Sequence, residues 1–330
     1  MSHLNRFFLF LMKSKLINFL SVFEKENIEK SFPLDYCLPV YHCVSDENLP
    51  HLKQIINYKN VKQFENDLDY FSKHFQFVNW EEFKDFFKGK FKAKKKIALL
   101  TFDDGFREFA DIVAPILKRK GIYAINFVNP SFIDNKDLMF RCKSSLIVDS
   151  IKSSTSKNIE ITVEEVLKIN YQNKSQLDQI AEKLEIDFGT YLKEQKPYLD
   201  SDQLKELTTQ GFGISAHSWD HPLYSELSLE DQLENTVQSL NFIKENQFLD
   251  DSFAFPFTDF GVKKDFFESL FKNKALSYSF GCAGIKLDSF DKNLQRIPME
   301  TGESAAQTLK KEIAYFKFKK LLNKNTIIRK

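Results

Sequence analysis

The sequence predicts an α/β fold in which parallel strands alternate with helices and form a barrel-like sheet. The clearest sign is the apolar run at residues 97–102, which follows three lysines and is typical of a strand buried on both faces. A helical pattern then runs to Gly121, and a second apolar segment spans residues 123–128. Strand, helix and strand in this order indicate a βαβ unit with parallel pairing.

The same alternation covers most of the chain. Pro115 lies inside the first helical pattern and predicts a kink there. A helix beginning at Ser228 is expected to face the core with Leu229, Leu233, Val237, Leu240 and Ile243. Further strands are expected at residues 35–42, 212–216, 252–257 and 276–280, and further helices at 61–75, 80–87, 202–209 and 305–322. In a barrel of such units the carboxyl ends of the strands meet at one face, where we expect the chemistry.

Composition and charge limit the classes of function. The chain has 330 residues, of which 42% are hydrophobic, so a sizeable core is expected. The 47 Lys and Arg residues nearly balance the 46 Asp and Glu residues, which excludes nucleic-acid binding driven by bulk charge. We divide the chain into an N-terminal amphipathic segment (1–34), a main domain (35–300) and a basic C-terminal helix (301–330). Residues 134–200 form a polar, helical insertion whose apolar content is too thin for a separate core.

The N-terminus and the cysteines bear on localisation. The apolar run at residues 7–12 ends at Lys13, so it is too short to span a bilayer, and no small-residue cleavage site follows it. The four cysteines form no C-x-x-C pair, which fits scattered, reduced thiols. We therefore expect a cytoplasmic protein. Peripheral membrane contact through the N-terminal segment or the basic C-terminal helix is a further option.

Two adjacent carboxylates, Asp103 and Asp104, end the strand at residues 97–102. Burying them costs free energy unless a cation or hydrogen bonds compensate. Ordinary turn chemistry explains one aspartate followed by Gly105, but it does not explain an aspartate at the last strand position.

Two histidines, His217 and His221, follow another predicted strand, and the whole chain has only six histidines. Pro222 disfavours a helix at His221, so the pair lies on a loop at a strand end. One carboxylate and two imidazoles make a set of three metal ligands with positions left for water and substrate. The other aspartate is then free to act as a base.

Taken together, these residues resemble a known family. Residues 101–105 read T-F-D-D-G and residues 217–221 read H-S-W-D-H, as in the first two motifs of the polysaccharide deacetylases (NodB-homology, carbohydrate esterase family 4-like). The resemblance implies a distorted (β/α) barrel with fewer than eight strands. It implies that Asp104, His217 and His221 bind one divalent metal ion and that Asp103 is the general base. Zinc suits these ligands, and nickel, cobalt or iron are alternatives.

The third motif departs from the family pattern. Residues 253–257 supply Pro256 and Phe257, which the resemblance assigns to the substrate groove, and we add Trp219 to that group. Ala254 stands where the family has an arginine that pairs with the base. We expect Arg296 or Arg141 to take that place.

The general acid is also unusual, since no histidine follows His221. The segment Val40-Tyr41-His42 is similar to the N-terminal strand of the poly-N-acetylglucosamine deacetylases, in which an early histidine is the acid. By that similarity His42 is the candidate acid. A strand histidine with no role in the reaction is the alternative.

The leading hypothesis is a metal-dependent hydrolase. It removes an N-acetyl group from an amino sugar of a surface or cell-wall polysaccharide or of its precursor. One alternative is a deformylase or amidase acting on a lipid-linked amino sugar or a small amide. A catalytically impaired sugar-binding protein is another, suggested by Ala254 and the missing late histidine. A membrane-contacting scaffold rests on composition alone.

Overall fold

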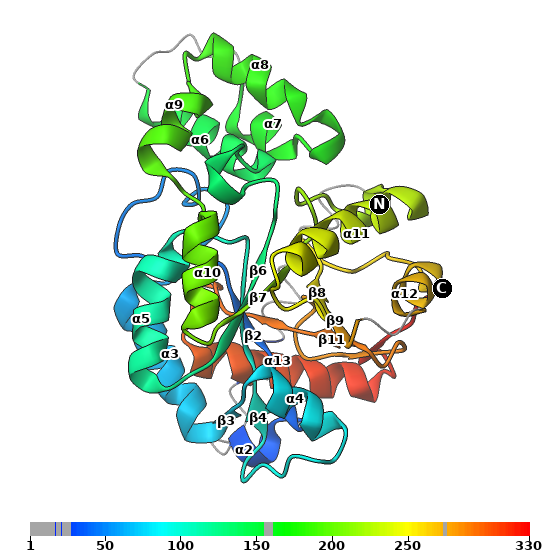
Figure 1. The fold of residues 1–330 in the computed structure, drawn as a ribbon. Coiled ribbons are helices and arrows are strands. Elements are labelled where there is room, and N and C mark those ends of the chain that lie inside the picture. The colour runs from blue at the N-terminus through cyan, green and yellow to red at the C-terminus, as the bar shows by residue number, and fades with distance from the viewer. Residues whose placement is uncertain (1–16, 18–20, 22–27, 155–160, 273–275) are drawn as a thin grey trace.

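The computed structural model describes Ile17, Ser21 and residues 28–154, 161–272 and 276–330. Its centre is a parallel sheet in the order β11-β9-β8-β7-β6-β5-β2-β12 (Figure 1). The expected N-terminal amphipathic segment lies almost wholly outside the described residues. No helix in the described part of the chain is long and apolar enough to cross a membrane. The strands are β2 (Pro39–Tyr41), β5 (Leu100–Asp103), β6 (Ala124–Val128), β7 (Gly213–Ala216), β8 (Ser252–Ala254), β9 (Tyr278–Gly281), β11 (Asn293–Gln295) and β12 (Ile297–Pro298).

The sheet closes because its two outermost strands are consecutive in the chain. Only Arg296 separates β11 from β12. Strand β11 pairs with β9, whereas β12 pairs with β2 at the other end of the sheet. The result is the distorted (β/α) barrel that the sequence predicted, although its sheet has eight strands rather than the expected fewer than eight.

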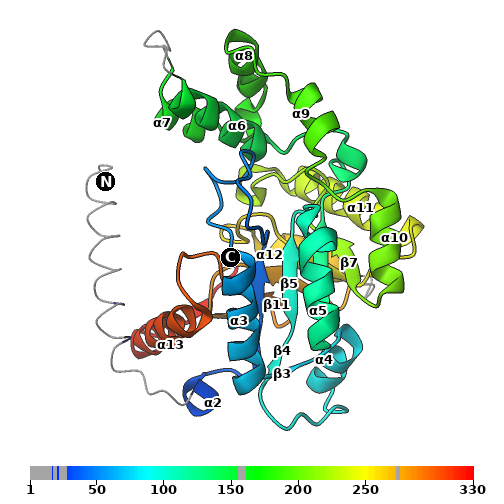
Figure 2. The ribbon, with the colours of Figure 1, turned by 90° about the vertical axis from the view of Figure 1, so that its left-hand side faces the viewer.

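Two layers of apolar side chains hold the barrel. One cluster includes Leu99, Ile125, Phe127 and Phe280, which occupy alternate positions along neighbouring strands, together with Trp80 of α4. A larger cluster joins the opposite faces of the strands to the helices. Figure 2 shows how these helices surround the sheet. These helices are α3 (Val61–His74), α4 (Trp80–Phe87), α5 (Ala114–Lys120), α10 (Ser201–Thr209), α11 (Leu229–Glu245), α12 (Lys264–Phe271) and α13 (Ala305–Leu321), with α2 (Ile28–Ser31) ahead of them. Smaller pairings involve β1 (Tyr36–Cys37), β3 (Gln76–Phe77) and β4 (Ile97–Ala98), and β10 (Leu287–Asp288) with β13 (Thr326–Ile327).

The expected kink at Pro115 is replaced by a change of helix type. A π-helical turn at Phe109–Val113 precedes α5, and Pro115 lies in the first turn of α5. Because the π-helical turn leads directly into α5, Pro115 lies within a continuous helical backbone, where its missing N–H removes one hydrogen bond of the usual helical pattern.

The predicted inward face of α11 is confirmed in part, since Leu233, Leu240 and Ile243 pack against the core. Leu229 is 41% exposed and Val237 is 49% exposed. The buried face carries Gln232, Thr236, Ser239 and Ile243. The Gln232 amide donates to the Tyr224 carbonyl oxygen at 2.6 Å, and the Tyr224 and Thr236 hydroxyls are 2.7 Å apart. Only Leu229 and Val237 were wrongly expected to face the core, and polar side chains of α11 lie on its buried face instead.

The prediction that the insertion lacks a core of its own was also wrong. Its helices are α6 (Phe140–Ser153), α7 (Val163–Lys168), α8 (Ser175–Lys183) and α9 (Phe188–Gln195), and they lie together at one end of the barrel (Figures 1 and 2). Ile147, Val148, Val166 and Leu177 form a buried cluster there. A capping box of Thr162 and Glu165 starts α7.

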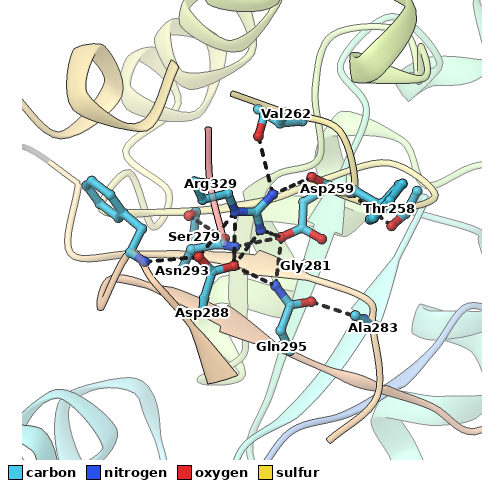
Figure 3. A network of polar contacts seen from close by, with 12 residues as sticks. Thr258, Asp259, Val262, Ser279, Gly281, Ala283, Asp288, Asn293, Gln295 and Arg329 are labelled. Carbon is cyan, nitrogen blue, oxygen red and sulfur yellow. Dashed lines mark hydrogen bonds and ion pairs between the residues drawn. The ribbon is translucent and has the colours of Figure 1, made fainter. Parts of the chain in front are cut away.

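A buried polar network fixes the C-terminus to the barrel (Figure 3). The Arg329 guanidinium forms ion pairs with Asp259 and Asp288, and all three side chains are at most 2% exposed. Asn293 and Gln295 of β11 donate to the same Asp259 oxygen at 2.6 and 2.7 Å. A Cβ at Gly281 would lie 2.4 Å from the Asp259 Cγ, so only glycine fits beside this network.

Removing the Arg329 guanidinium should be costly, because two buried carboxylates lose their cation. We expect Arg329→Met to lower the free energy of unfolding by roughly 3–5 kcal/mol in chemical denaturation. The matched control is Arg119→Met, since Arg119 makes an exposed ion pair with Glu65. That change should cost less than about 1 kcal/mol. Equal losses in the two variants would contradict this account of the network.

Candidate metal and catalytic site

The turn after β5 brings two carboxylates to the end of the barrel. Asp103 is the last residue of the strand, and Asp104 and Gly105 follow with φ of +74° and +68°. A Cβ at Gly105 would lie 3.1 Å from a methyl carbon of Val128 on the next strand. A left-handed Asp104 is an unfavourable conformation for a residue with a side chain, and such strain is concentrated at functional sites.

The loop after β7 brings the two histidines to the same end. The His217 N–H donates to the Val128 carbonyl oxygen at 2.9 Å, which continues the sheet by one residue. The His221 N–H donates to the Ser218 Oγ at 3.1 Å. Ser218 and His221 also have positive φ, +71° and +63°. The amide of Asn129 donates to the His217 and Ser218 carbonyl oxygens and so fixes the loop.

Asp104, His217 and His221 meet as the spacing predicted. The His221 Nε2 lies 3.2 Å from the Asp104 Oδ1, and the His217 Nε2 lies 3.5 Å from it. The three potential ligand atoms all lie within 4.8 Å of one another, and all three residues are buried. In the described part of the chain this is the one such group of ligands.

The chemistry of these donors fits a divalent cation. The His217 Nδ1 lies 3.0 Å from the Ala254 carbonyl oxygen, which only accepts, so the hydrogen is on Nδ1 and the Nε2 lone pair is bare. Burial lowers the pKa of His217 to about 4, so the ring is neutral at pH 7. Among the described residues, neither the His217 Nε2 nor the Asp104 Oδ1 has a hydrogen-bond partner. A cation bound there would satisfy both atoms.

Arg296 contacts Asp103. Its two terminal nitrogens donate to the two Asp103 oxygens, each at 2.6 Å, and its side chain is fully buried. Burial raises the pKa of Asp103, but Arg296 and His217 outweigh it and the net shift is downward. Asp103 is therefore ionised at neutral pH and held in one orientation.

Arg141, the other arginine expected at Asp103, does not pair with it. One guanidinium nitrogen donates to the Leu167 carbonyl oxygen at 2.9 Å, and the group lies over the rings of Phe140 and Phe257. Arg141 belongs to the insertion, whereas Arg296 lies between β11 and β12, at the seam where the barrel closes. Of these two arginines, only Arg296 reaches the base.

His42 is paired with a carboxylate that the sequence analysis missed. The His42 Nδ1 donates to Glu300 at 2.5 Å, and the backbone N–H groups of His42 and Cys43 donate to the other Glu300 oxygen at 3.0 and 2.9 Å. Glu300 lies just beyond β12, which pairs with β2 ahead of His42. An acidic residue two positions after the last strand of the barrel is the one local signal, and the sequence analysis expected no strand there.

The contact with Glu300 stabilises the protonated form of His42. Burial lowers the pKa of His42, but the Glu300 charge and hydrogen bond, with Asp104 and Asp103, outweigh it and raise the pKa to about 10. His42 is therefore protonated at neutral pH, with its Nε2 not used by Glu300.

These groups share a cavity of about 520 Å³, lined by His42, Asp103, Asp104, Arg141, His221 and Phe257 among others. Leu167 and Met139 of the insertion also line it, opposite Ile55 and Ile56 of the N-terminal part. The insertion also contacts the histidine loop directly. The Tyr171 hydroxyl and the Lys174 amine both donate to Asp220, at 2.6 and 2.9 Å.

Of the three residues expected in the substrate groove, only one lines the cavity. Phe257 lines the cavity, with its ring centroid 4.4 Å from that of His221. Pro256 is buried beside it and does not line the cavity. Trp219 does not line this cavity but lines a second one of about 280 Å³ together with Lys143 and Asp178, so its contact with substrate stays a prediction.

Comparison with known proteins identifies the family. The family model of polysaccharide deacetylases matches residues 90–261, more than half of the chain, and this range contains both sequence motifs. The chain belongs to the polysaccharide deacetylase family. No protein of curated function matches its sequence.

Solved structures of such deacetylases share the barrel. The Streptococcus pyogenes deacetylase PplD, solved in complex with acetate, has a TM-score of 0.55 at 16% identity and covers 84% of this chain and 97% of its own. IcaB from Ammonifex degensii has a TM-score of 0.54 at 15% identity, with coverage of 84% and 97%. The de-N-acetylase from Aggregatibacter actinomycetemcomitans has a TM-score of 0.53 at 16% identity, with coverage of 83% and 99%. At these identities the likeness shows the common fold.

Zinc should stabilise the folded protein through the three ligands. After chelation, we expect added Zn²⁺ to raise the Tm of the wild type in thermal denaturation, because the ion binds only the folded site. His217→Ala should show little or no rise and should lower the zinc content of the purified protein. His74→Ala, on α3, is the control and should behave as the wild type. An equal rise in His217→Ala would show that zinc binds elsewhere.

Proposed function

We propose that this deacetylase is a metal-dependent enzyme that removes the N-acetyl group from an amino sugar of a surface or cell-wall polysaccharide or of its precursor. The observation that carries the proposal is the buried set of potential ligands Asp104, His217 and His221 beside an oriented carboxylate. In the described chain the Asp104 Oδ1 and the His217 Nε2 have no hydrogen-bond partner. A polar reaction centre of this kind at the bottom of a mostly apolar cavity is typical of a small-molecule or glycan site.

Asp104, His217 and His221 would hold the cation, with zinc first and nickel, cobalt or iron as alternatives. When bound, such an ion polarises the acetamide carbonyl and lowers the pKa of water. Ala254 helps to orient a metal ligand, because its carbonyl oxygen accepts a hydrogen bond from the ring of His217. This backbone contact needs no arginine side chain at position 254.

Asp103 is the proposed general base. Its carboxylate is ionised and lies 3.7 Å from the His217 Nε2, so it is placed to take a proton from water that attacks the acetamide carbon. Arg296 holds the carboxylate in place through two parallel hydrogen bonds. The reduced basicity of Asp103 is the consequence of this orientation.

His42 is the proposed general acid. It lines the same cavity as Asp103, and Glu300 keeps its ring protonated and oriented. It would donate its proton to the nitrogen that leaves as the amine. Acetate and a free amino sugar are the products.

The contacts of Arg296 and His42 argue against a catalytically impaired sugar-binding protein. Arg296 orients the base in place of the arginine that Ala254 replaces, and His42 is the candidate acid in place of the missing late histidine. A deformylase or a small-amide hydrolase would use the same groups, and an assay of acetate against formate release separates them. We place the reaction in the cytoplasm, with peripheral membrane contact through the N-terminal segment and α13.

Replacing the base should remove activity but leave the metal. We expect Asp103→Asn to lower the rate of acetate release from N-acetylglucosamine oligomers by a factor of about 10² to 10⁴. Its zinc content should remain close to that of the wild type. Turnover at the wild-type rate would refute the role of Asp103, and loss of zinc would assign Asp103 to the metal.

Replacing the partner of His42 should change the pH profile. The protonated form of His42 is the active one, and its raised pKa places the alkaline loss of kcat/KM near pH 10. Glu300→Gln removes the charge that raises the pKa, so the alkaline limb should move to lower pH. Glu303→Gln, which disrupts a surface ion pair with Lys311, is the control. An unmoved limb in Glu300→Gln would contradict the role of His42.

A further inference from the structure

We propose that Arg141 binds an anionic group of the substrate, so that the natural substrate carries a phosphate or carboxylate next to the N-acetylated sugar. This inference rests on the proposed function and names the class of glycan. It starts from a guanidinium in the reaction cavity that has no carboxylate partner.

Arg141 differs from the other arginines in the described residues. Arg107 pairs with Asp111, Arg119 with Glu65, Arg296 with Asp103, and Arg329 with Asp259 and Asp288. No carboxylate of the described chain lies within ion-pair distance of Arg141, whose one hydrogen bond goes to the Leu167 carbonyl oxygen at 2.9 Å. A guanidinium has five N–H donors in a planar fork, so most of its capacity is unused.

The position of Arg141 matches a substrate contact. It is half-buried and lines the cavity that contains Asp103, Asp104 and His221. Its Cζ lies 5.7 Å from the centroid of the Phe257 ring, and that ring is in contact with His221 at 4.4 Å. One aromatic ring therefore separates the guanidinium from a proposed metal ligand. A group one step along the glycan from the reacting acetamide would reach it.

The charges of the cavity leave Arg141 uncompensated. Arg296 neutralises Asp103, Glu300 neutralises His42, and Asp104 belongs to the proposed metal site. Burial lowers the pKa of Arg141, with only a distant contribution from Glu226 opposing it. A partly buried cation without a partner is unfavourable, and a bound oxyanion would relieve that cost through two parallel hydrogen bonds.

The charge of the reaction product is a further reason to expect an anionic substrate. Deacetylation produces an amine that binds a proton at neutral pH, and an unpaired guanidinium in the same cavity repels it. An anion on the same substrate would remove that repulsion.

The competing explanation is structural: Arg141 joins α6 to α7 through Leu167 and stacks on Phe140.

The test compares neutral and anionic probes of the same reacting group. Binding is measured by calorimetry, and acetate release in parallel, for three probes: N,N′,N″-triacetylchitotriose (neutral), N-acetylglucosamine 1-phosphate and a hyaluronan tetrasaccharide (carboxylate). We expect the wild type to bind one of the two anionic probes at least ten-fold more tightly than the neutral one. The anionic probe that is preferred identifies phosphate or carboxylate.

Arg141→Gln should reduce the ratio of anionic to neutral affinity to near one, and Arg141→Lys should retain part of it. The matched control is Arg107→Gln, which removes a partly buried guanidinium paired with Asp111 and should keep the wild-type ratio. An unchanged ratio in both Arg141 variants, or a wild type without anion preference, would overturn the inference.

If the wild type deacetylates chitotriose without anion preference, the proposed function stands and only this inference fails. If no probe releases acetate, the function fails, and the binding ratio still tests Arg141.

Discussion

The ion pair between Arg296 and Asp103 connects the closure of the barrel to its chemistry. Arg296 is the residue at which the chain stops pairing with β9 and starts pairing with β2. Its fully buried guanidinium requires a carboxylate inside the barrel, because an unpaired buried charge is costly. Asp103 at the end of β5 supplies that carboxylate and is thereby held beside Asp104 and His217. The seam of the fold and the proposed base therefore depend on one contact.

The helical insertion makes the open end of the barrel into a substrate cavity. It has its own buried cluster, and it reaches the histidine loop through Tyr171 and Lys174, which both bind Asp220. It also carries Arg141 into the cavity. Some of its apolar side chains form that separate cluster, whereas others, including Met139 and Cys142, pack with Cys43 and Phe106 of the barrel part. Such an element is suited to determine which glycan the common reaction centre accepts.

The sequence predicted the barrel and the four residues of its two motifs, because buried parallel strands have a strong apolar signal and their carboxyl ends meet at one face. It did not predict Glu300, which lies 258 residues from His42 and belongs to no motif. Nor did it decide between Arg296 and Arg141, since only the closure of the sheet brings Arg296 to Asp103. Leu229 and Val237 were wrongly expected to face the core, because polar side chains lie on the buried face of α11, among them Gln232, which donates to Tyr224.

X-ray absorption spectroscopy of the zinc-loaded protein tests the central claim most directly, because it reports the ligands of the ion themselves. The account predicts scattering from two imidazole rings and one carboxylate oxygen, with Zn–N distances of about 2.0–2.1 Å. The spectrum of Asp104→Asn should change at the zinc, whereas that of Arg119→Met should not. A zinc environment with no imidazole, or one that does not respond to Asp104, would contradict the account.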